Sequence, residues 1–226
     1  MNYYLGGYYW ISLCKHNGAD LYTASDCINN SMMGYWAYPL GRDEDALKSA
    51  YHDINVESNE LKRLRQWVDE KLEQQHLGWI SIFYDVNTAK SYEATFLAHI
   101  PDKVLLALYF PDGEASDFLE EFSPRDTDMG GIGLYEQLSR KIKEEPLANE
   151  RTLGFDLIGI EMGGDFHSFH CHSIAGDLFE KFGLHLNSYG LIDHIPDPDA
   201  LSRYLNDEET GLEPVPWFIV KVKLVK

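Results

Sequence analysis

The sequence predicts one α+β domain, residues 1–226, in which helices pack against a mixed or largely antiparallel sheet. Two near-continuous apolar runs, 103–110 and 153–162, have the composition of buried strands. Amphipathic segments at helical spacing separate these runs, so strands and helices share one core. A chain of 226 residues is long enough to bury such a core without disulfides or metals. The alternative is a two-lobed arrangement divided near Pro146.

Three elements are predicted in the first third of the chain. Residues 8–13 are rich in tyrosine, tryptophan and isoleucine and have the composition of a strand. A helix is expected to begin near Asp43. A second helix should cover 57–75, because its apolar residues recur at helical spacing: Leu61, Leu64, Trp67, Val68 and Leu72.

The middle of the chain alternates between strands and short helices. Residues 79–86 read as a strand, and Asn87 is a candidate N-cap for a helix that reaches Phe96. The apolar run 103–110 should be a central strand, ended by a turn at 111–113. Two further helices are expected at 117–122, capped near Ser116, and at 134–145, stopped by Pro146.

In the last third of the chain, the sequence predicts two strands with two helices between them. After the strand at 153–162, a helix should cover 173–182 with Gly183 just beyond its end. Asp197 followed by Pro198 is a strong start signal for a helix that runs to about Asn206. Residues 218–225 alternate, which predicts a strand with one buried face and with its lysines, Lys221 and Lys223, on the other face.

The chain is strongly acidic, with 37 Asp and Glu against 19 Lys and Arg and a formal net charge of -18. Such a field repels nucleic acid and anionic membranes and favours a protein partner with a basic surface. The carboxylates concentrate in residues 112–128 and again in 193–213, although a solvated surface is the simpler explanation for either run. The predicted partner-binding residues are those of the first run: Asp112, Glu114, Asp117, Glu120, Glu121, Asp126 and Asp128.

The cysteines and the N-terminus favour a cytoplasmic protein. The chain has three cysteines, an odd number, and no C-x-x-C pair, so a disulfide framework is not expected. The first residues lack the basic and apolar regions of a signal peptide.

Three segments near the C-terminus carry a resemblance to a known class of proteins. They are residues 153–161, 166–171 and 213–217. Together they resemble bacterial proteins of the immunity type, which are encoded beside polymorphic or contact-dependent toxins. The resemblance covers about residues 150–226. It implies a cytoplasmic protein that binds and occludes one toxin domain and has no catalysis of its own. The acidic charge fits a basic toxin domain, of which a nuclease is the first expectation.

The densest cluster of reactive side chains is the histidine-rich segment 166–172. It suggests an alternative function, a small metal-dependent hydrolase that binds zinc through His167, His170 and His172, with Asp165 or Glu161 as a further ligand. On a strand, however, residues of different parity point to opposite faces. A purely structural junction, with Phe166 and Phe169 buried and the histidines bonded to backbone, is therefore expected more strongly. The same parity separates Cys171 from its neighbouring histidines and argues against a catalytic dyad. No other cofactor is expected.

Overall fold

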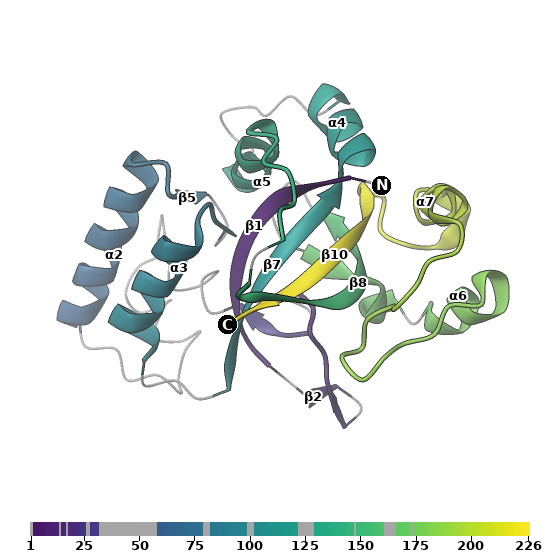
Figure 1. Cartoon of the computed structure of the whole chain (residues 1–226), viewed down its shortest axis with the longest axis horizontal. Coiled ribbons are helices and arrows are strands. Elements are labelled where there is room, and N and C mark those ends of the chain that lie inside the picture. The colour runs from purple at the N-terminus through teal and green to yellow at the C-terminus, as the bar shows by residue number, and fades with distance from the viewer. Residues whose placement is uncertain are drawn as a thin grey trace.

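A curled antiparallel sheet forms the centre of the computed structural model (Figure 1). The structure describes residues 2–13, 15–16, 18–25, 28–31, 58–78, 82–98, 102–121, 129–146, 148–160, 166–172 and 174–226. The strand order is β5-β6-β1-β7-β10-β8-β9, and β4 also pairs with β1. Each of these neighbouring pairs is antiparallel. The predicted α+β class with a largely antiparallel sheet is therefore confirmed.

Four long strands make up most of the sheet. They are β1 (Tyr3–Ser12), β7 (Lys103–Pro111), β8 (Glu150–Ile160) and β10 (Trp217–Val225). The shorter members are β4 (Asn30–Ser31), β5 (Leu77–Gly78), β6 (Ile82–Phe83) and β9 (Phe166–Ser168), and a separate ribbon pairs β2 (Lys15–His16) with β3 (Ala19–Asp20). Because β10 lies between β7 and β8, strands from both sides of Pro146 share one sheet.

Helices α2 (Ser58–Glu73) and α3 (Val86–Tyr92), with the π-helical turn η1 (Glu93–Leu97), pack against one face of β1 and β7. The apolar stripe predicted for α2 is in the core, since Leu64 and Val68 are buried and Trp67 packs against them. The Trp67 ring lies 5.3 Å from that of Tyr92. The core cluster on this face includes Tyr8, Trp10, Leu64, Val68, Tyr92, Leu97, Leu105 and Tyr109.

The opposite face of the sheet is covered by α4 (Asp112–Glu121) and α5 (Met129–Ser139). Phe118 of α4 meets Phe218 of β10 edge to face, with ring centroids 5.6 Å apart. This contact places α4 against the beginning of β10. The core cluster here includes Tyr9, Leu106, Phe110, Phe118, Leu134, Leu138, Ile158, Phe218 and Val220.

Helices α6 (Ala175–Phe182) and α7 (Pro198–Leu205) lie at the end of the sheet opposite α2 and α3 (Figure 1). They bury Leu178, Leu201 and Leu205 against Leu157, Trp217 and Ile219. The predicted start of α7 is confirmed, because the Asp197 side chain accepts a hydrogen bond from the Ala200 N–H at 2.9 Å. Gly183 ends α6 in the left-handed conformation, with φ at 65°.

Several element boundaries differ from the sequence-based predictions. Helix α3 is capped by Asp85, whose side chain accepts from Thr88 N, and Asn87 lies inside the helix. Helix α4 begins at Asp112 directly after β7, so the predicted turn at 111–113 was wrong. Helix α5 ends at Ser139 rather than at Glu145. Two residues after this end, Lys141 takes a positive φ of 50°, which is incompatible with a continuing helix. The helix expected near Asp43 and residues 79–81 lie outside the described residues.

The lysines of β10 also differ from prediction, because β10 is a central strand with both faces covered. Lys223 is only 6% exposed. Its ammonium lies 2.8 Å from Glu144 and 3.3 Å from Glu150, and Lys221 pairs with Glu144 at 2.6 Å. The lysines therefore form a nearly buried ion-pair network rather than a solvated face.

Among the described helices, none combines the length and the apolar composition that crossing a membrane requires.

Candidate functional site

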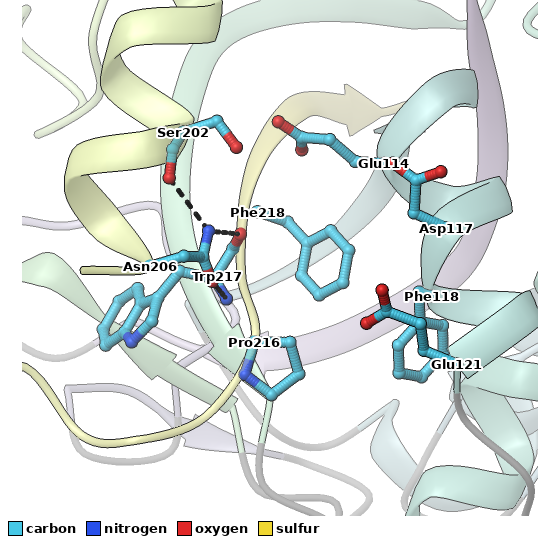
Figure 2. Close-up of a pocket in the computed structure, with 9 residues that line it drawn as sticks. All are labelled: Glu114, Asp117, Phe118, Glu121, Ser202, Asn206, Pro216, Trp217 and Phe218. Atoms are coloured by element: carbon cyan, nitrogen blue, oxygen red, sulfur yellow. Dashed lines mark hydrogen bonds between the residues drawn. The ribbon is translucent and has the colours of Figure 1, made fainter. Parts of the chain in front are cut away.

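An acidic pocket opens between α4 and α7, above the first residues of β10 (Figure 2). Its volume is about 390 Å³. The lining residues are Glu114, Asp117, Phe118, Glu121, Ser202, Asn206, Pro216, Trp217 and Phe218. Three of them are carboxylates and none is basic. The pocket therefore combines negative charge with an aromatic floor.

Helix geometry gathers the three carboxylates on one wall. Glu114, Asp117 and Glu121 are spaced by three and four residues along α4, which puts them on the same face of the helix. Phe118, the neighbour of Asp117, is buried and anchors that face to the core. The carboxylates therefore line one wall of the pocket while the apolar side of α4 packs against the sheet.

Glu114 is the most deeply placed of the three. One of its carboxylate oxygens accepts a hydrogen bond from the Ile219 N–H at 3.4 Å. Burial raises the pKa of its carboxyl group, and the nearby charges of Asp117 and Asp199 raise it further, against hydrogen bonds from Ser202 and Ile219 that lower it. The negative charge on Glu114 is therefore costly in the free protein, and a cation entering the pocket would relieve that cost.

The opposite wall is held rigidly by Asn206 at the C-terminal end of α7. Its side-chain amide accepts a hydrogen bond from Trp217 N at 2.9 Å and donates to Trp217 O at 3.1 Å (Figure 2). It also donates to Ser202 O at 3.0 Å. Asn206 therefore ties α7 to the first residue of β10 and fixes the width of the pocket.

A second cluster lies near this pocket and contains two of the predicted histidines. His167 of β9 and His172 of the 3-10 turn η2 (Phe169–His172) both contact Glu213. The Glu213 Oε2 atom lies 3.1 Å from His167 Nδ1 and 3.2 Å from His172 Nε2. His170 does not join them, because its Nε2 lies 2.8 Å from the Gly190 carbonyl oxygen. The structure therefore brings together His167, His172 and Glu213 rather than the three histidines.

Neither comparison with known proteins finds a relative. No protein-family model matches the chain, and no solved structure matches it significantly. The pocket and the histidine cluster are therefore interpreted from their own geometry.

The histidine segment is also a packed junction between strand and helix. Phe166 and Phe169 are buried, at 1% and 0% exposure. Cys171 lies against Ser25, with Sγ and Oγ 3.4 Å apart, so its thiol faces a hydroxyl group. The packing of this junction by its two phenylalanines follows the structural interpretation made from the sequence.

The predicted partner-binding residues divide into three groups. Glu114, Asp117 and Glu121 line the pocket, whereas Asp112 and Glu120 lie on the same helix outside its lining. Asp126 and Asp128 are outside the described residues. Composition alone identified α4 as acidic but could not select the face that lines the pocket.

The other pocket residues had no signal in the sequence. Ser202, Asn206 and Trp217 are ordinary helix and strand residues until the fold brings α7 beside α4. Glu213 was part of a predicted acidic run, yet its contact with His172 spans 41 residues of sequence. Contacts of that kind depend on strand order, which short-range patterns do not report.

Proposed function

We propose that this protein is an inhibitor of the immunity type, which binds a basic toxin domain and occludes it through the pocket between α4 and α7. The observation that carries the proposal is the composition of the pocket: three carboxylates and an aromatic floor, with no basic residue in the lining. The net charge of -18 adds long-range attraction for a basic partner.

The chemistry of the pocket suits a long basic side chain of the partner. Carboxylates bind a guanidinium group with paired, charge-assisted hydrogen bonds. The rings of Phe118 and Phe218 offer apolar surface for the aliphatic part of an arginine or lysine, whereas the Trp217 ring points away from the carboxylates (Figure 2). Glu114, whose charge is penalised by burial, gains most from a cation beside it.

Such a contact would inhibit a nuclease-type toxin directly. Enzymes that act on nucleic acid use arginine and lysine side chains to hold phosphate groups. A residue of this kind, inserted in the pocket, is no longer available to the substrate. Inhibition then needs no catalysis by the inhibitor.

Protection of cells is the functional test. The C-terminal domain encoded directly upstream of this chain's gene should arrest growth when expressed alone and should be neutralised by co-expression of the parent protein. The triple variant Glu114→Gln/Asp117→Asn/Glu121→Gln should fail to protect, because it removes the charges that line the pocket.

The matched control removes three charges elsewhere on the surface. Asp69, Glu73 and Glu180 are exposed and do not line the pocket. The variant Asp69→Asn/Glu73→Gln/Glu180→Gln should protect as the parent does. Equal protection by both triple variants, or an upstream domain without toxicity, would reject the proposal.

A further inference from the structure

The geometry points to a divalent transition-metal site of the zinc class, formed by His167, His172 and Glu213. These three residues present one nitrogen or oxygen atom each, and the three atoms lie within 4.8 Å of one another. Among the described residues, these three are the group of potential metal ligands whose ligand atoms lie close enough together to share one ion. The inference does not depend on the identity of the protein partner.

Two of the three distances between the ligand atoms match the edges of a metal coordination sphere. Zinc binds histidine nitrogen and carboxylate oxygen at about 2.0–2.2 Å in tetrahedral geometry, so neighbouring ligand atoms lie roughly 3.3 Å apart. Glu213 Oε2 is 3.1 Å from His167 Nδ1 and 3.2 Å from His172 Nε2. The two histidine nitrogens lie within 4.8 Å of each other, so the imidazole rings would move closer together when they share one ion.

The fold holds the ligands in place. His167 pairs with Gly159 of β8 in the sheet, and its side chain is only 11% exposed. The His172 ring meets Trp217 edge to face at 5.4 Å, and the Trp217 Nε1–H donates to the Glu213 carbonyl oxygen at 3.1 Å. Neighbours that fix the orientation of metal ligands in this way increase metal affinity.

The ligand types select the metal. Two imidazole nitrogens and one carboxylate oxygen are typical of zinc and of other late first-row divalent ions, whereas calcium and magnesium prefer oxygen ligands alone. Three protein ligands leave a coordination position for water or for another donor.

The site also adjoins the acidic pocket. Glu213 is connected through a short segment to Pro216 and Trp217, which line that pocket. A bound ion would therefore clamp the segment 213–217 to the junction of β9 and η2. The expected role of the ion is to hold this wall of the pocket in position.

Calorimetric titration of the chelator-treated full chain with zinc chloride tests the site. The parent should bind one zinc ion per chain at micromolar concentration or below. His172→Gln and Glu213→Gln should each weaken binding by about 100-fold or more, since even residues that only orient metal ligands contribute 10–100-fold. Glu213 is 37% exposed in its side chain, so its replacement should leave the fold intact.

The matched control is His170→Gln, which alters the same segment without touching the cluster. It should keep zinc affinity within about threefold of the parent, a change that lies within ordinary context effects. Cobalt bound in place of zinc should give visible absorption bands in the parent and in His170→Gln, and none in Glu213→Gln. No stoichiometric zinc binding by the parent, or equal losses in His170→Gln and His172→Gln, would overturn the assignment.

Discussion

Replacing Lys223 by methionine should destabilise the protein by about 3–5 kcal/mol, because it leaves a buried carboxylate without its cation. The side chain of Glu150 is only 1% exposed, and its Oε2 atom lies 3.3 Å from the Lys223 ammonium. The Tyr109 hydroxyl donates to the same carboxylate at 2.9 Å but brings no compensating charge. Urea unfolding at neutral pH measures the loss.

An exposed ion pair provides the comparison for this prediction. Lys181 and Asp177 have side chains that are 52% and 51% exposed, so Lys181→Met should have little effect on the free energy of unfolding. The double variant Lys223→Met/Glu150→Gln should recover part of the lost stability, since the orphaned charge is gone. Equal losses for Lys223→Met and Lys181→Met would contradict the role given to the buried network.

Replacing Asp156 by asparagine should stabilise the protein by roughly 4 kcal/mol above neutral pH and have much less effect near pH 4. Asp156 is fully buried in β8, where its carboxylate accepts a hydrogen bond from Ser168 Oγ at 2.9 Å. Burial raises the pKa of its carboxyl group to about 7, despite hydrogen bonds from Thr23 and Ser168 that lower it.

The sign of this effect follows from proton binding. Between about pH 4, where aspartate ionises in the unfolded chain, and about pH 7, the folded protein holds one more proton at Asp156 than the unfolded protein does. The contribution of Asp156 to stability therefore falls by about 1.4 kcal/mol per pH unit across that range and then levels off. The matched control is Asp69→Asn, a change at an exposed surface position, which should alter the free energy of unfolding little. A difference between Asp156→Asn and the parent that is constant from pH 4.5 to 8.5 would be inconsistent with a buried, protonated Asp156.

Elements with local signals could be predicted from the sequence. The start of α7 at Asp197-Pro198 and the end of α6 at Gly183 depend on capping interactions within a few residues, and both occur as expected. The central position of β7 follows from its unbroken apolar run, which fits a strand covered on both faces.

Features that depend on distant partners could not be predicted. The two lysines of β10 look like a solvated face in the sequence, yet they pair with Glu144 and Glu150, more than 70 residues away. Glu213 could not be predicted as a partner of His167 for the same reason, since the two residues are far apart in the sequence. Buried charges of this kind contradict the usual burial preferences and become intelligible only when their counter-charges are located.

The candidate pocket could be predicted from the sequence only in part. The acidity of α4 is a property of composition, so its carboxylates were selected from the sequence. The face they share depends on the helix starting at Asp112, five residues earlier than the short helix predicted at 117–122. The aromatic floor requires β10 to run beneath α4, a consequence of strand order.

The most direct measurement of the central claim is the affinity of the chain for the C-terminal domain encoded upstream, determined by calorimetry over a range of salt concentrations. The parent and the variant Asp69→Asn/Glu73→Gln/Glu180→Gln should bind tightly, with affinity that falls as salt increases. The variant Glu114→Gln/Asp117→Asn/Glu121→Gln should bind about 100-fold more weakly at low salt and depend less on salt. Equal affinities for the two triple variants at every salt concentration would contradict a binding site in the acidic pocket.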